Sequence, residues 1–249
     1  MSQHPTLVTS RTEDGISVIT LDSPANRNAL STALLTQLTD AVNEAGVDES
    51  VRAMLLTSSQ RVFCAGADLK EAASVDMIEQ ARRIITVQRA IVAAPVPVVC
   101  RLDGPVRAGG LGLVASADLV VAAESVTFAL TEVRLGLAAA TISIPLRARL
   151  EPRIAADWFL TGRQFTADEA RAGGLVTTVA PEADMDDTVA GILADLRLGH
   201  RQGLSAAKEL LTADLLADFD ARGEEMARLS GLLFHSEVAQ QRMAAALRR

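Results

Sequence analysis

Residues 96–123, VPVVCRLDGPVRAGGLGLVASADLVVAA, carry the pattern that decides the fold class. Residues 96–102 are an apolar run typical of a buried strand, and the Asp-Gly-Pro tripeptide at 103–105 ends that strand. Glycines then open a short helix of small residues, and residues 119–123 form a second buried strand. A strand, a glycine-rich turn, a helix and a further strand in this order predict an α/β core.

The segments on either side of this stretch extend the same pattern. Alternating residues predict a strand at 16–21, an apolar run predicts another at 51–57, and apolar residues at helical spacing predict a helix over 76–92. Residues 126–137 are expected to be extended, and the chain from Asp184 onward is expected to be helical. The sequence therefore predicts an α/β core followed by a C-terminal helical layer.

The composition is that of a folded, mildly acidic protein. Of 249 residues 49% are hydrophobic, and the formal net charge is -7, which excludes intrinsic disorder and argues against nucleic acid as a partner. No apolar run is long enough to span a membrane, and the N-terminal residues do not resemble a signal peptide. Because the chain has two cysteines and three histidines, we expect no disulfide framework, no metal site and a cytoplasmic location.

Backbone amides are the first candidates for chemistry. Adjacent glycines at 109 and 110 open a helix, where N–H groups lack intrahelical acceptors and can stabilise negative charge that develops on an oxygen. Gly66 permits an unusual turn that leaves the N–H of Ala67 as a second donor. Each feature also has a purely structural alternative, since glycine allows close helix packing and ordinary turns. Spacing alone does not decide between them.

Glu132 is the next candidate. In an extended segment Glu132 and Arg134 share one face. On the surface such a pair contributes little to stability. In an apolar pocket Glu132 would be an acid/base group whose pKa is raised by desolvation and partly lowered by Arg134. Periodicity does not choose between the two. Cys64 and Cys100 have no histidine nearby in the sequence and are expected to be core residues.

Five segments of the chain, taken in order, form a characteristic set. They are PANRNAL at 24–30, FCAGADLKE at 63–71, DGPVRAGG at 103–110, FALTEVRLG at 128–136, and TGR, ADEA and GLV between 161 and 176. The set resembles the enoyl-CoA hydratase/isomerase, or crotonase, superfamily. The resemblance implies a crotonase-like (ClpP/crotonase) spiral of ββα units over residues 1–190. It also implies a C-terminal helical trimerisation region over 191–249, with assembly into a homotrimer or a hexamer.

The same resemblance implies where the chemistry lies. The family binds acyl-CoA thioesters and uses no metal or redox cofactor. Its oxyanion hole corresponds to the backbone N–H groups of Ala67 and Gly109, and its glutamate acid/base corresponds to Glu132. The residues implied to bind the CoA part of the substrate are Arg27, Ala65, Asp68, Leu69 and Lys70.

One position departs from the hydratases that use two glutamates. Their first glutamate corresponds to Gly112, so Glu132 is the one that is kept. A single-glutamate branch similar to methylglutaconyl-CoA hydratases shares this glycine, which makes an enoyl-CoA hydratase-type lyase the leading hypothesis. A Δ3,Δ2-enoyl-CoA isomerase, which needs one base, is the alternative. An acyl-CoA-binding protein without activity is the third hypothesis.

Overall fold

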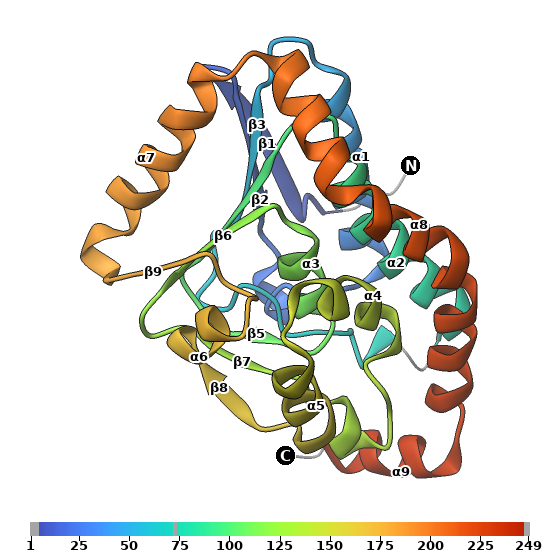
Figure 1. The fold of residues 1–249 in the computed structure, drawn as a ribbon. Helices are drawn as coiled ribbons and strands as arrows, with labels where there is room; N and C mark the ends of the chain where they lie inside the picture. Colours follow the sequence, from blue (N-terminus) through green and yellow to red (C-terminus); the bar gives the residue numbers. More distant parts are fainter. Residues whose placement is uncertain (1–4, 72–73, 247–249) are drawn as a thin grey trace.

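Two β-sheets form the core of the computed structural model, which describes residues 5–71 and 74–246 (Figure 1). Six strands pair in the order β1-β2-β3-β4-β6-β9, and three short strands pair as β5-β7-β8. The strands of the larger sheet are β1 (Val8–Glu13), β2 (Ile16–Leu21), β3 (Ala53–Ser58), β4 (Val98–Leu102), β6 (Leu119–Ala123) and β9 (Thr178–Ala180). Those of the smaller sheet are β5 (Val106–Arg107), β7 (Thr127–Ala129) and β8 (Gln164–Thr166).

Helices connect the strands and fill the C-terminal part of the chain. The α-helices are α1 (Thr32–Val47), α2 (Met77–Ala93), α3 (Gly110–Ser116), α4 (Ala140–Arg149), α5 (Pro152–Thr161), α6 (Ala167–Ala172), α7 (Met185–Leu198), α8 (Arg201–Phe234) and α9 (Glu237–Ala246). The 3-10 helices are η1 (Pro24–Asn26), η3 (Glu132–Leu135) and η4 (Glu182–Asp184). None of the described helices is long and apolar enough to cross a membrane.

The larger sheet confirms the predicted α/β core. Five of its strands, β2, β3, β4, β6 and β9, run parallel to one another, which requires crossover connections. Strand β1, which pairs antiparallel with β2 through the turn at Asp14 and Gly15, was not predicted. Both turn residues have positive φ, 48° and 77°. An Asp-Gly pair before an alternating strand is a strong hairpin signal and would have revealed β1.

The prediction of an extended segment over 126–137 is wrong beyond Ala129. Strand β7 ends there, and residues 132–135 form the 3-10 helix η3. Gly136 has φ +74° and donates its N–H back to the carbonyl groups of Glu132 and Val133, which closes the turn. The smaller sheet pairs β7 over only three residues, so nothing holds the following segment extended.

The long helix α8 packs along α2 and α4 and runs down one side of the molecule (Figure 1). Lys208, which is 4% exposed, anchors it to the core. Its Nζ donates to the carbonyl oxygens of Ile91 and Val96 at 2.9 and 3.1 Å and lies 2.7 Å from Asp118 Oδ2. Burial lowers the pKa of Lys208, while the pairing with Asp118 opposes that shift. Helix α8 is therefore fastened to the core.

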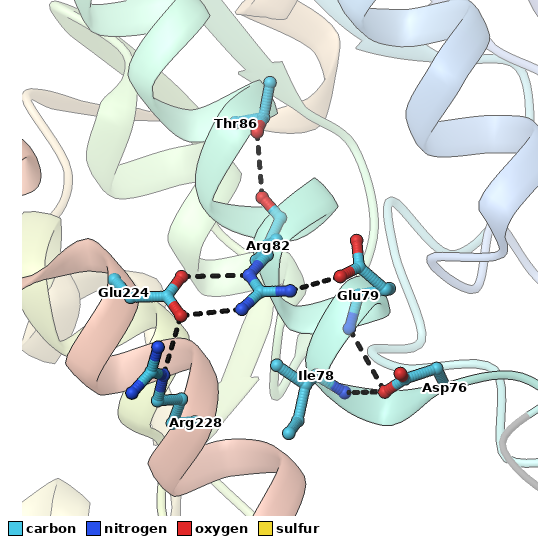
Figure 2. Close-up of polar contacts among 7 residues, drawn as sticks. All are labelled: Asp76, Ile78, Glu79, Arg82, Thr86, Glu224 and Arg228. Carbon is cyan, nitrogen blue, oxygen red and sulfur yellow. Dashed lines mark hydrogen bonds and ion pairs between the residues drawn. The ribbon is translucent and has the colours of Figure 1, made fainter.

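Exposed ion pairs add to the α2–α8 contact (Figure 2). Arg82 on α2 donates two hydrogen bonds to Glu224 on α8, at 2.9 and 2.6 Å, and also pairs with Glu79. Arg228 donates to the same Glu224 carboxylate at 2.7 Å. The hydrogen bonds from Arg82 and then Arg228 lower the pKa of Glu224 to about 2. Asp76 caps α2 by accepting from Ile78 N at 2.8 Å, which fixes where this helix begins.

Candidate active site

A cavity of about 130 Å³ brings together residues from distant parts of the chain. The loop at 65–69, the start of α3, the segment at 131–141 and the helices α2 and α8 all contribute to its lining. The three predicted catalytic residues, Ala67, Gly109 and Glu132, line this same cavity. The structure therefore brings together groups that lie up to 65 positions apart in the sequence.

The main chain at Ala67 and Gly109 forms one wall. A Cβ built on Gly109 would lie 3.9 Å from Ala67 N, and one built on Gly66 would lie 3.6 Å from Gly109 N. Within residues 5–71 and 74–246, neither Ala67 N–H nor Gly109 N–H has an acceptor. Gly66 has φ +94° and Ala108 has φ +46°. These uncommon conformations precede the two free N–H groups and set their direction, an arrangement suited to binding an oxyanion.

A second cavity, of about 220 Å³, borders the same loop. It shares Ala65, Ala67 and Leu69 with the first cavity, so the loop at 65–69 borders both cavities. All the residues predicted to bind CoA line this second cavity, namely Arg27, Ala65, Asp68, Leu69 and Lys70. The structure thus groups these residues beside the predicted oxyanion hole, and their role in binding stays a prediction.

Side-chain hydrogen bonds hold the loops around the second cavity. Asn28, which has φ +54° and is fully buried, accepts from Ser23 N at 2.7 Å and donates to the carbonyl oxygen of Phe63 at 3.1 Å. Asp68 accepts from Asn26 Nδ2 at 2.9 Å and from Lys70 N at 3.0 Å. Asp68 therefore joins the two loops that form this cavity.

Glu132 lies at the first position of η3. Residues three apart in a 3-10 helix share one face, so Glu132 and Leu135 both face the cavity. Oε2 of Glu132 is buried and has no partner among the described residues. Desolvation raises the pKa of Glu132 from 4.5 to about 7, and a hydrogen bond from its own backbone opposes the shift. A carboxyl group in this state can both accept and donate a proton near neutral pH.

The expectation that Glu132 and Arg134 share one face of an extended segment is wrong. In η3 these residues are two positions apart and point in different directions. Arg134 is exposed, and its Nε lies 3.3 Å from the place where a Cβ on Gly162 would be. The rise in the pKa of Glu132 is therefore not reduced by Arg134, which makes no contribution to it.

Gly112 lies on α3, one turn after Gly109. A Cβ there would lie 2.5 Å from Ile142 Cγ2 and 2.6 Å from Gln88 Nε2, so the space beside Gly112 is already filled. The sequence did not predict that Gln88 fills this space, although a polar residue on the apolar face of a predicted helix was a visible signal. Ser230 and Phe234 of α8 also line the cavity, and neither was predicted as a site residue.

The predicted cysteine environment is confirmed. Cys64 and Cys100 are both fully buried and free, and burial raises the pKa of the Cys64 thiol to about 12. Among the described residues there is no group of three or more His, Cys, Asp or Glu side chains that could hold a metal ion. Glu132 is the one titratable side chain among the described residues that line the first cavity.

Comparison with known proteins identifies the family. The family model described as enoyl-CoA hydratase/isomerase matches residues 11–246. The crystal structure of an enoyl-CoA hydratase from Mycobacterium avium is 40% identical, with a TM-score of 0.91 over 98% of this chain and 97% of that one. This match confirms the predicted crotonase-like fold.

Two curated relatives of this chain have different names. The chain is 31% identical over 218 residues to enoyl-CoA hydratase domain-containing protein 3, mitochondrial, from Rattus norvegicus, covering 86% of this chain and 73% of the relative. It is 32% identical over 210 residues, 82% of this chain and 80% of the relative, to a protein of Rhodococcus jostii. That protein is named (7aS)-7a-methyl-1,5-dioxo-2,3,5,6,7,7a-hexahydro-1H-indene-carboxyl-CoA hydrolase. This chain is an enzyme that belongs to the enoyl-CoA hydratase/isomerase family.

Proposed function

We propose that the protein is an enoyl-CoA hydratase-type lyase that adds water to a 2-enoyl-CoA thioester. The observation that carries the proposal is the position of Glu132, whose buried carboxyl faces the same small cavity as the main-chain donors. Those donors, Ala67 N–H and Gly109 N–H, have no acceptor within the described chain. One group for proton transfer and two donors for an oxyanion are what addition to a conjugated thioester requires.

The chemistry follows from these groups. The oxygen of water forms a bond to C3 while the electrons of the C2=C3 bond move toward the thioester, and negative charge develops on the thioester oxygen. Ala67 and Gly109 donate hydrogen bonds to that oxygen and lower the energy of the enolate-like state. Glu132 accepts a proton from the attacking water and returns it to C2. Its pKa of about 7 suits both transfers near neutral pH.

The cavity lining supports a short, uncharged acyl group as the substrate. No Lys, Arg or His side chain lines the cavity in the described part of the chain, and most of the lining is apolar. A substrate carboxylate would be buried there without a counter-charge and close to Glu132, which disfavours it strongly. Cavities of about 150 Å³ accept a benzene ring. A cavity of about 130 Å³ therefore suits an acyl chain of about four to six carbons.

The second candidate function is a Δ3,Δ2-enoyl-CoA isomerase. Glu132 is the one carboxylate among the described residues that line the first cavity, and moving a double bond needs one base. In that reaction Glu132 would take a proton from C2 and return it at C4. The same oxyanion hole would hold the same enolate, so the donors do not distinguish the two reactions.

We also propose how the CoA part of the substrate binds. The second cavity shares Ala65, Ala67 and Leu69 with the first, so it borders the same loop as the place where the thioester would lie. Arg27 and Lys70 are exposed cations at this cavity and can approach the CoA phosphates. Ala65, Leu69 and the Asp68 turn supply its main-chain surface.

A homotrimer, or a hexamer built from two trimers, is the proposed assembly. Leucines on the helices after residue 190 are strongly exposed: Leu198 by 88%, Leu210 by 85%, Leu211 by 81% and Leu232 by 67%. Burying apolar surface of this kind contributes about 25 cal/mol per Å². Light scattering on the purified protein measures the assembly. A trimeric or hexameric mass supports the proposal, and a monomer would contradict it.

A panel of thioesters tests the function. Crotonyl-CoA, methylglutaconyl-CoA and a 3-enoyl-CoA are assayed by the ultraviolet absorbance of the conjugated thioester. We expect absorbance to fall with crotonyl-CoA, and to fall much more slowly with the carboxylated methylglutaconyl-CoA. A rise with the 3-enoyl-CoA and no change with crotonyl-CoA would establish the isomerase instead.

A further inference from the structure

Buried hydroxyl groups on helices α4 and α8 are of two kinds, and those of the first kind are satisfied by their own helix. Ser143 Oγ on α4 donates to the carbonyl oxygen of Ala140 at 2.7 Å. Thr212 Oγ1 on α8 donates to the carbonyl oxygen of Lys208 at 2.8 Å. A bond to the carbonyl three or four residues earlier is the usual way in which a helix satisfies a buried hydroxyl.

Thr141 on α4 and Ser230 on α8 are of the second kind. They are 8% and 7% exposed, and neither hydroxyl has a hydrogen-bond partner among the described residues. Both residues line the first cavity, and neither hydroxyl is fully enclosed as the amide of Gln88 is. Because a buried hydroxyl without a partner is costly, these two groups are suited to a ligand atom in the cavity.

The two hydroxyls belong to one part of the cavity wall. Helices α4 and α8 pack against each other, and Ser143 Oγ lies 3.6 Å from Met226 Sδ. Thr141 precedes Ser143 by two residues, and Ser230 follows Met226 by about one helical turn. Both hydroxyl-bearing residues are therefore within about one turn of the contact that joins the two helices.

This helical wall lies away from the place proposed for CoA. The helical residues that line the first cavity are Met77, Ala81 and Ile84 of α2, Thr141 of α4, and Ser230 and Phe234 of α8. None of these described residues lines the second cavity. A thioester held by Ala67 and Gly109 would thus direct CoA toward the second cavity and its acyl chain toward the helices. Thr141 and Ser230 are the polar residues of that otherwise apolar wall.

We propose that Thr141 and Ser230 bind an uncharged oxygen, a ketone or a hydroxyl group, carried by the acyl chain of the substrate. The proposal names the acyl class for the function proposed above and rests on the acyl-CoA site described there. Each hydroxyl can donate one hydrogen bond, and a ketone oxygen can accept two. A neutral oxygen also avoids the repulsion that a carboxylate would meet beside Glu132. A purely apolar chain of the same size would leave both hydroxyls buried and unpaired.

The test uses pairs of saturated thioesters that differ in one atom. In 4-oxopentanoyl-CoA a ketone oxygen takes the place of a methyl group of 4-methylpentanoyl-CoA. The pair 5-oxohexanoyl-CoA and 5-methylhexanoyl-CoA places the same difference one carbon further along the chain. Because these compounds have no C2=C3 bond, calorimetry measures their binding without turnover. In at least one pair the wild-type protein should bind the ketone on the order of 10-fold more tightly.

Variants of the full-length protein assign this preference to the two hydroxyls. The double variant Thr141→Val, Ser230→Ala removes both with little change of shape, and the preference for the ketone should disappear or reverse. Ser143→Ala and Thr212→Val remove hydroxyls that their own helices satisfy, and the preference should remain. If thermal unfolding shows that the double variant does not fold, each single variant should still lose roughly threefold of the preference.

Three results would overturn the proposal. The first is equal binding of both members of each pair by the wild-type protein. The second is a preference for the ketone that survives in the folded double variant. The third is a preference that Ser143→Ala removes as fully as the double variant does. A wild-type protein that keeps the preference but does not hydrate crotonyl-CoA would remove the hydratase function alone and support the role of the two hydroxyls.

Discussion

Two kinds of reactive group line the cavity: a main-chain half, the N–H groups of Ala67 and Gly109, and a side-chain half, the carboxyl of Glu132. Ala67 N–H and Gly109 N–H are directed by the conformations of Gly66 and Ala108 and by the loops that hold them. Glu132, in contrast, is a buried carboxyl in a one-turn helix, with Oε2 unpaired among the described residues. The directions of the two N–H groups are fixed by the fold, whereas the carboxyl of Glu132 is held in a buried environment that disfavours its charged form.

This difference separates two ways of building a catalytic site. Main-chain donors serve any reaction that passes through an enolate on a thioester, so the family can keep them while its reactions vary. The buried carboxyl determines where protons go, and therefore which reaction is performed. Substitutions of Glu132 and substitutions that affect the main-chain donors should therefore differ both in the type of effect on activity and in its size.

The largest effect is expected from the side-chain half. Glu132→Gln keeps the shape of the residue but cannot accept a proton, so kcat for crotonyl-CoA should fall roughly 10²- to 10⁴-fold. Butyryl-CoA should bind as it does to the wild type, which isothermal calorimetry measures. Glu124→Gln, at an exposed glutamate away from the cavity, is the control. Turnover unaffected by Glu132→Gln would remove this residue from the mechanism.

The main-chain half is tested by Gly109→Pro. Proline removes the N–H, and the φ of -50° at Gly109 is one that proline adopts. Losing one donor of this kind should lower kcat/KM roughly 10²- to 10³-fold. Gly109→Ala keeps the N–H, and its Cβ meets the flexible end of Leu30 at 2.9 Å, so it should lose less activity. Equal losses in the two variants would show that bulk, not the missing donor, is responsible.

The two halves also differ in how far the sequence predicts them. Glycine pairs and the order of five motifs predicted the fold and the positions of Ala67, Gly109 and Glu132. The 3-10 turn at Glu132 was missed, because the alternation of apolar and charged residues there imitates a strand, and the turn depends on Gly136. The contact between Gln88 and Gly112 could not be predicted, since it depends on how α2 packs on α3.

The burial of Glu132 should also make the free energy of unfolding depend on pH. Folding raises its pKa from 4.5 to about 7, so the folded state binds this proton more tightly than the unfolded state. The stabilisation that this proton gives the folded state is complete below pH 4.5. It is lost between pH 4.5 and 7, by about 1.4 kcal/mol for each unit of the pKa shift. Chemical denaturation should show wild-type stability falling relative to Glu132→Gln across that window. A constant difference between the two proteins would contradict the burial of this carboxyl.

The smallest effect is expected at the solvent-exposed edge of the second cavity. Lys70→Ala should raise KM for crotonyl-CoA about two- to fivefold at low salt, with kcat unchanged, because an exposed cation attracts phosphate weakly. The difference should shrink at 0.5 M salt, where screening is strong. A KM that does not respond to Lys70→Ala at any ionic strength would remove this residue from CoA binding.

The pH dependence of kcat/KM for crotonyl-CoA hydration tests the central claim most directly. If Glu132 must be ionised to accept the proton of water, the rate should rise with pH through an apparent pKa of about 7 and then level off. The residual activity of Glu132→Gln should lack this rise. A wild-type profile that is flat from pH 5 to 9, or that rises only near pH 4.5, would contradict a desolvated Glu132 as the acid/base group.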